Sequence, residues 1–158
     1  MVEPLADWVI ERIGQAAELY HRLVMLVAPA GSGKTVALQE VHKRPAAPLV
    51  NVNLELSRGM LDLTSRQRAL QLPRLLAEIV GASTADVVLL DNLEVLFDVS
   101  LKQDPLRLLQ GLSRNKTVVA AWSGSIDGEY VVYATPDHPE YKRYPVRDFL
   151  VVNPEAVA

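Results

Sequence analysis

The chain has 158 residues, of which 16 are Lys or Arg and 19 are Asp or Glu, for a net charge of −3 at neutral pH. This length is typical of one domain that buries a sizeable core, and the slight acidic excess does not favour nucleic-acid binding by the molecule as a whole. The chain contains no cysteine, which excludes a disulfide framework, a thiolate nucleophile and a cysteine metal site. No apolar run approaches the roughly 20 residues of a membrane helix, and the amino terminus lacks the basic and then apolar pattern of a secretory signal, so we expect a cytoplasmic protein without membrane contact.

The first elements in chain order are an amphipathic helix and a buried strand. Apolar residues recur at helical spacing within residues 1–20, which predicts an amino-terminal helix with Trp8 in the core rather than against a nucleotide base. Residues 23–27 are aliphatic without interruption and predict a strand. Good helix formers follow residue 35, so the intervening segment links a strand to a helix.

That linking segment, APAGSGKT over residues 28–35, matches the end of the Walker A pattern G-x-x-x-x-G-K-[ST]. Ala28 stands where the first glycine of the pattern belongs. Gly31 and Gly33 permit backbone angles that other residues avoid, and the first N–H groups of the following helix lack intrahelical partners. The segment therefore predicts a phosphate-binding loop.

Each residue type in this loop has a chemical role in the prediction. Backbone amides would surround the β-phosphate of ATP, Lys34 would reach the β- and γ-phosphates, and the Thr35 hydroxyl would bind Mg²⁺. The predicted nucleotide-binding residues are Ala30, Gly31, Ser32, Gly33, Lys34, Thr35 and Val36.

The next segments predict a second strand, a helix and a third strand. Apolar and polar residues alternate within residues 48–56, which is the period of a strand with one polar face. Thr64 and Gln67 fit a capping box at the start of a helix that Gly81 ends, in which Pro73 either kinks the helix or lies near a second start.

The third strand is continuously apolar over residues 87–90 and ends at Asp91, which is the Walker B pattern. Parallel strands deliver such residues to the sheet edge where the phosphate loop also lies, so Asp91 is the second predicted Mg²⁺ residue.

The residue that orients the attacking water is less clearly marked. The usual position next to the Walker B aspartate holds Asn92, a departure from the pattern. Glu94 is the first candidate for this role and Glu55, beyond the second strand, is the alternative. Ser123, after the fourth strand, is the candidate sensor of the γ-phosphate, with Ser125 as the alternative.

The remainder of the chain predicts a helix that starts at Asp104 and Pro105, a fourth strand over residues 117–122, and a β-hairpin-like extension over residues 129–152. Lysine, arginine and tyrosine interleave in EYKRYPVR, residues 140–147, so DNA contact by this segment is open although the net charge does not indicate it.

Together these elements predict one α/β domain spanning residues 1–158: a three-layer P-loop NTPase core with a mainly parallel five-stranded sheet and helices on both faces. Only about 35 residues follow the fourth strand, so we expect no helical lid domain.

The combination of APAGSGKT, NVNLELSR, VVLLDNLEVLF, a fourth strand that ends in tryptophan, and YATPDHPEYKRY resembles the BrxF family of small P-loop proteins from type III BREX bacteriophage-defence systems. It is also similar to the core of AAA+ and STAND ATPases. The resemblance implies an ATP-binding subunit that works beside other BREX proteins, with site residues Lys34, Thr35 and Asp91.

The sequence therefore predicts an ATP·Mg²⁺-binding protein that hydrolyses ATP slowly and acts as a nucleotide switch, as a homo-oligomer or with other BREX subunits. A small-molecule kinase and a scaffold subunit with weakened nucleotide binding are the alternatives. The sequence does not separate ATP from GTP, although no complete N-K-x-D guanine signature is present.

Overall fold

The computed structural model of the chain describes residues 5–29, 31–43 and 47–154. Its centre is a five-stranded sheet in which all neighbouring strands are parallel, in the order β2-β3-β4-β1-β8. The five strands are β1 (Leu23–Ala28), β2 (Leu49–Asn51), β3 (Val87–Asp91), β4 (Thr117–Ser123) and β8 (Leu150–Val152).

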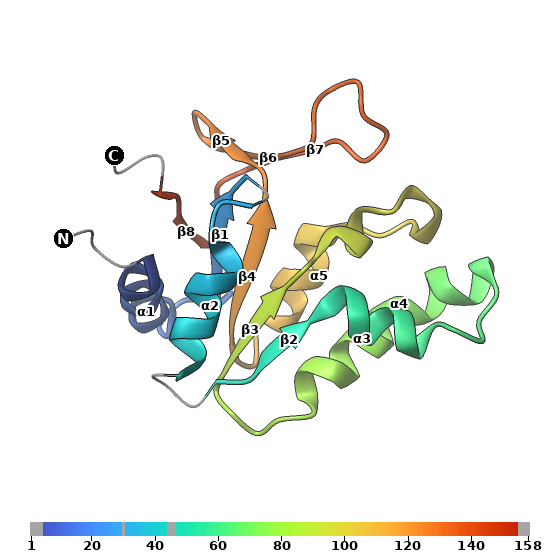
Figure 1. Cartoon of the computed structure of the whole chain (residues 1–158), viewed down its shortest axis with the longest axis horizontal. Coiled ribbons are helices and arrows are strands. Elements are labelled where there is room, and N and C mark those ends of the chain that lie inside the picture. Colours follow the sequence, from blue (N-terminus) through green and yellow to red (C-terminus); the bar gives the residue numbers. More distant parts are fainter. Residues whose placement is uncertain (1–4, 30, 44–46, 155–158) are drawn as a thin grey trace.

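Helices cover both faces of this sheet, as Figure 1 shows. One face carries α1 (Leu5–Ala16) and α2 (Lys34–Lys43), and the other carries α3 (Val52–Gly59), α4 (Ser65–Gly81) and α5 (Pro105–Leu112). Two short 3-10 helices, η1 (Glu94–Phe97) and η2 (Val99–Leu101), follow β3. The expected fold class, a three-layer α/β core with a parallel five-stranded sheet, is confirmed.

The two helical layers explain why β1 is apolar at every position. Val24 and Leu26 pack in the cluster under α1 and α2, whereas Leu23, Met25 and Val27 pack in the cluster under α3, α4 and α5. Successive side chains of a strand point to opposite faces, so a strand covered on both faces has no polar side.

The prediction of a second strand over residues 48–56 is wrong in its length. The strand ends at Asn51, whose side chain accepts a hydrogen bond from the Leu54 amide at 3.0 Å and caps helix α3. Asparagine is among the best N-cap residues, and the buried residues Val52 and Leu56 are four apart, which is also helical spacing. The alternation therefore belongs to a helix.

Helix α4 runs without interruption from Ser65 to Gly81, so Pro73 is not a second start. Proline lacks the N–H that would bond the carbonyl four residues earlier. That carbonyl, on Ala69, instead accepts a hydrogen bond from Gln103 Nε2 at 2.7 Å. A side chain from the segment before α5 thus replaces the missing helical bond.

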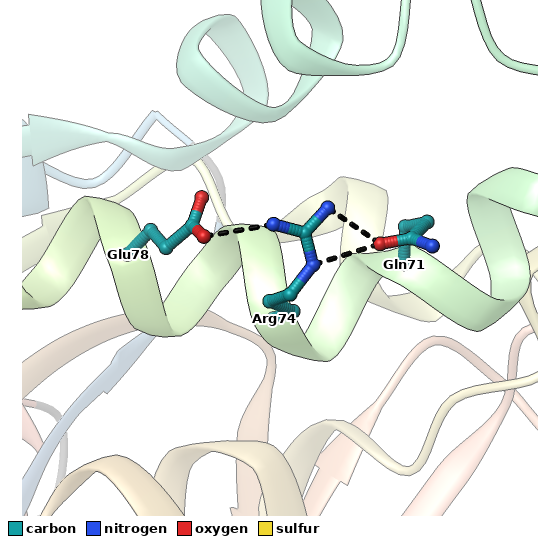
Figure 2. A network of polar contacts seen from close by, with 3 residues as sticks. All are labelled: Gln71, Arg74 and Glu78. Atoms are coloured by element: carbon teal, nitrogen blue, oxygen red, sulfur yellow. Dashed lines mark hydrogen bonds and ion pairs between the residues drawn. The ribbon is translucent and has the colours of Figure 1, made fainter.

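The exposed side of α4 carries the polar network of Figure 2. The Arg74 guanidinium donates to Gln71 Oε1 at 2.6 and 2.8 Å and to Glu78 Oε2 at 2.8 Å. These pairs are three and four residues apart, a spacing that stabilises a helix by a few tenths of a kcal/mol for each pair, about 0.2 to 0.5. Their role is local.

The predicted capping box at the start of α4 is present, with Thr64 Oγ1 and Gln67 Oε1 each accepting the other residue's amide. We expect Thr64→Ala to lower the free energy of unfolding by about 1 kcal/mol, because one helix N–H loses its partner. Urea denaturation measures this change. The Ser65→Ala variant is the control, and an equal loss in both variants would contradict the assignment.

The carboxyl-terminal extension expected over residues 129–152 divides between two sheets. A small antiparallel sheet contains β5 (Ser125–Asp127), β6 (Tyr130–Tyr133) and β7 (Lys142–Pro145), whereas β8 joins the central sheet beside β1. Trp122 Nε1 donates to the Val132 carbonyl at 3.1 Å. A Cβ at Gly124 would lie 2.0 Å from the same oxygen, so the approach of the small sheet to β4 requires glycine there.

The structure also limits two further expectations. The amino-terminal helix expected over residues 1–20 ends at Ala16, and residues 1–4 lie outside the described part of the chain. No α-helix follows β4 among the described residues up to Pro154, in accord with the expected lack of a helical lid. None of the helices in the described ranges combines the length and apolar character needed to cross a membrane.

Candidate functional site

The predicted phosphate loop links the carboxyl end of β1 to the first turn of α2 (Figure 1). Gly31 and Gly33 have φ of 79° and 97°, in the left-handed region that glycine adopts without strain. The turn thereby aims the amino terminus of α2, with its free N–H groups, along the sheet edge. Ala30 lies outside the described residues.

Lys34 is the first residue of α2 and is 6% exposed. Its Nζ donates to the Ala28 carbonyl at 2.9 Å and to the Pro29 carbonyl at 2.8 Å. An ammonium group has three donors, so one remains for a ligand. Burial lowers the pKa of Lys34, and the nearby Glu94 and Asp91 carboxylates oppose that shift.

The two predicted Mg²⁺ residues are in direct contact. Thr35 Oγ1 donates to Asp91 Oδ2 at 2.7 Å. Thr35 lies in the first turn of α2, and Asp91 is the last residue of β3. Asp91 is 7% exposed, and its other oxygen, Oδ1, accepts from the Asn92 amide at 2.9 Å. The sheet therefore brings the Thr35 hydroxyl and the Asp91 carboxylate to one point.

Glu94 and Ser123 are also in contact at this edge. Ser123 Oγ donates to Glu94 Oε2 at 3.0 Å, which links the end of β4 to the first residue of η1. The Glu94 carboxylate acts on the pKa values of both Lys34 and Tyr133. It therefore lies between the loop and the small sheet. Ser125, the alternative sensor, lies in β5.

The structure does not bring Glu55 into this group. Its carboxylate lies 3.5 Å from Arg58 Nη1 on the same helix. Glu55 lines a cavity of about 500 Å³ between α3 and α4, together with Leu75 and Ile79. Among the described residues, the carboxylate in contact with the predicted sensor serine is that of Glu94.

The remaining predicted loop residues are accessible. Ser32 is exposed and its Oγ donates to the Pro29 carbonyl at 2.5 Å. Val36 is 63% exposed on the first turn of α2. Both can meet a ligand without a change in the core.

Asn92, which the sequence marks only as a departure from the Walker B pattern, directly follows Asp91 at this sheet edge. It has φ of 56°, and its carbonyl accepts from the Asn53 amide of α3 at 3.1 Å. Asparagine tolerates the left-handed region better than most residues. An asparagine directly after a buried strand was therefore the sequence signal for a left-handed turn at this position.

Aromatic rings connect the site to the small sheet. Phe97 of η1 stacks on Tyr133 of β6 with 3.6 Å between ring centroids, and both meet Trp122 of β4 edge-on. Burial, with the Glu140 and Glu94 carboxylates, raises the pKa of Tyr133 to about 12. Its hydroxyl therefore stays protonated to a higher pH than an ordinary tyrosine.

Trp8 packs against the core cluster under α1 and α2, as expected from the sequence. It also lines a cavity of about 580 Å³ between α1, β8 and the small sheet, with Val151 and Val152 on another wall. Among the described residues of the predicted phosphate loop, none lines this cavity.

The strand order β2-β3-β4-β1-β8 and the glycine-containing loop after β1 define a three-layer α/β architecture with a parallel five-stranded sheet. No family model and no curated protein sequence matches the chain. Among solved structures, the structure of C. elegans PCH-2 is similar at 14% identity with a TM-score of 0.39, over 94% of this chain and 39% of that one. The chain thus spans about two fifths of that chain's length.

Proposed function

We propose that this chain binds ATP·Mg²⁺ at the loop site, defined as residues 31–36 with Asp91, Glu94 and Ser123, and that it hydrolyses ATP slowly as a nucleotide switch. The observation that carries the proposal is the 2.7 Å contact between Thr35 Oγ1 and Asp91 Oδ2 beside the buried Lys34 ammonium. Binding of a nucleoside triphosphate with Mg²⁺ requires a phosphate-binding loop, a hydroxyl and a carboxylate at one sheet edge.

The binding roles follow from the geometry of the loop. The amides of Gly31, Gly33 and the first turn of α2 offer hydrogen bonds to the β-phosphate, and the helix dipole favours the negative charge there. Lys34 Nζ now holds two loop carbonyls, so phosphate would compete with them or use its third donor. Ammonium and phosphate then form a charge-assisted contact.

The donor set fits Mg²⁺ bound jointly with a nucleotide. Magnesium prefers oxygen ligands and is usually held by one or two protein oxygens plus substrate phosphates and waters. Thr35 Oγ1 and Asp91 Oδ2 are such oxygens, and Asp91 is buried. Bound Mg²⁺ would neutralise charge on the β- and γ-phosphates. Among the described residues, no group of three or more His, Cys, Asp or Glu side chains forms a separate metal site.

Glu94 and Ser123 would act on the γ-phosphate side. The Glu94 carboxylate can orient a water molecule and accept its proton, while the Ser123 hydroxyl can donate either to Glu94 or to a phosphate oxygen. This choice of partner makes the Ser123 hydrogen bond sensitive to the nucleotide state.

The switching part of the proposal involves the segment from Tyr130 to Tyr144. Glu94 opens the 3-10 helix that carries Phe97, and Phe97 stacks on Tyr133 of β6. Loss of the Ser123 bond to Glu94 would therefore disturb the ring contacts that hold the small sheet. An ordered γ-phosphate contact can bias such a two-state segment.

The partner part of the proposal rests on the resemblance to the BrxF family. We infer that the nucleotide state controls association of the chain with itself or with other subunits of a BREX phage-defence complex. Light scattering after size-exclusion chromatography, with and without ATP·Mg²⁺, tests for self-association. A mass that is the same in both states, together with no nucleotide-dependent binding to BREX subunits, would reject this role.

The Lys34→Ala variant tests nucleotide binding. We expect the affinity for ATP to fall at least about tenfold, or about 1.4 kcal/mol, because the phosphates lose a charge-assisted contact. Isothermal titration calorimetry measures the change, and circular dichroism checks folding.

Lys43→Ala is the matched control, because Lys43 ends the same helix and its Nζ lies 3.7 Å from the exposed Glu40 carboxylate. It should bind ATP like the wild type. Unchanged affinity in Lys34→Ala would remove the phosphate-loop assignment, and no binding by the wild type would favour the scaffold alternative.

A further inference from the structure

We propose that Asn92 is a positioning residue of the Mg²⁺ site, and that its left-handed backbone conformation aims the Asp91 carboxylate at Thr35. The inference rests on the proposed function, since it concerns how the chain prepares the same site for ATP·Mg²⁺. It assigns a role to the residue that replaces the usual second acid of the Walker B pattern.

The conformation of Asn92 is the first step of the argument. With φ of 56°, the residue lies in the region where an L side chain crowds the backbone. Glycine adopts this region freely, asparagine is tolerated, and a β-branched residue is disfavoured. Position 92 therefore requires a residue that can adopt a positive φ, which glycine and asparagine do more easily than a β-branched residue.

The contacts of the Asn92 backbone are the second step. Its N–H donates to Asp91 Oδ1 at 2.9 Å, while Thr35 Oγ1 donates to Asp91 Oδ2 at 2.7 Å. The hydrogen bond from the Asn92 N–H thus fixes the rotation of the Asp91 carboxylate, and Oδ2 is the oxygen that faces Thr35. Displacement of the peptide group between Asp91 and Asn92 would break this hydrogen bond and let the carboxylate rotate.

The anchoring of the turn is the third step. The Asn92 carbonyl accepts from the Asn53 amide at 3.1 Å, and Asn53 is the second residue of α3. Amides at this position have no partner inside their own helix. The turn is thus attached to a helix on one side and to the Mg²⁺ carboxylate on the other. Both contacts of this turn are made by backbone atoms of Asn92.

The path of the chain after the turn agrees with this role. Leu93 is buried in the core at 2% exposure, and Glu94 then starts η1 with its carboxylate bonded to Ser123. The reversal at Asn92 therefore sets the direction in which Glu94 leaves the sheet edge.

The test compares Asn92→Gly, Asn92→Ala and Asn92→Val in the full chain. Calorimetry gives the ATP affinity of each with Mg²⁺ and with EDTA, and the ratio of the two is the Mg²⁺-dependent gain. We expect the Mg²⁺-dependent gain of Asn92→Gly to stay within about twofold of the wild-type value. The gain of Asn92→Val should be about tenfold smaller than that of the wild type, because the left-handed region is unfavourable for β-branched residues. Asn92→Ala should lie between them and serves if the valine variant does not fold.

The affinity in EDTA should be equal in all variants, because the phosphate loop is unchanged; a general loss of structure would lower it as well. Equal losses of the gain in the glycine and valine variants would overturn the proposal, since they would assign the effect to the asparagine side chain. A full gain in Asn92→Val would also overturn it. If the wild type binds ATP without any Mg²⁺-dependent gain, this proposal fails while nucleotide binding stands; if the wild type binds no ATP, both fail.

Discussion

Glu94→Gln should reduce the ATP turnover rate by about 10²- to 10⁴-fold while the affinity for ATP·Mg²⁺ stays within about twofold, because general-base catalysis contributes about that much. Glutamine keeps the size of the side chain and can still accept the Ser123 hydrogen bond, so only the basicity is removed. Steady-state phosphate release and calorimetry measure the two quantities separately.

Glu55→Gln is the control for this experiment, since Glu55 pairs with Arg58 and lines the cavity between α3 and α4. It should leave turnover unchanged. If Glu55→Gln abolishes turnover and Glu94→Gln does not, the two roles must be exchanged.

Activity should also rise steeply when a neighbouring subunit completes the site, by as much as about 10³- to 10⁵-fold, which is the typical effect of an arginine supplied in trans. In the proposed site, Lys34 and Mg²⁺ would neutralise only part of the charge on the transferring group. Turnover per chain, measured over a range of protein and partner concentrations alongside light scattering, should be low for dilute monomer and increase with association.

Arg143 is our candidate for this arginine. Its guanidinium lies 3.5 Å from the centre of the Tyr130 ring on the small sheet, whereas the Arg114 guanidinium lies 5.2 Å from the centre of the Tyr20 ring and Arg114 precedes β4 in the chain. Mixing Lys34→Ala with Arg143→Ala should restore activity that neither variant has alone, because one supplies the arginine and the other an intact loop. Arg114→Ala is the control and should behave like the wild type. Rapid turnover by dilute monomer, independent of concentration, would reject an arginine in trans.

The parts of the fold that depend on neighbouring residues in sequence could be predicted. The capping box of Thr64 and Gln67 and the N-cap of Asp104 both lie where expected. The apolar run before Asp91 predicted a strand covered on both faces, and its last residue does lie at the loop edge. Such signals need only a few residues to be read together.

The parts of the fold that depend on residues distant in sequence could not be predicted. Asn51 ends its strand because its side chain caps a helix, while its alternating neighbours fit either period. The helix bond missing at Pro73 is replaced by Gln103, which no local pattern could indicate. In the site, the sequence pointed to Glu94, but its contact with Ser123 depends on the turn at Asn92.

The position of β1 between β4 and β8 has a consequence for how the protein forms. Leu26 of β1 pairs with Ala121 of β4 on one side and with Val152 of β8 on the other, so both neighbours come from the last third of the chain. During synthesis β1 is made before β4 and β8, so it has neither of its neighbouring strands at first. Contacts between such distant segments slow folding, and an unpaired apolar strand is prone to aggregation meanwhile. The environment of the loop after β1 is therefore complete only when β4 and β8 have both paired with β1, and under the proposed function nucleotide would stabilise the chain from that point.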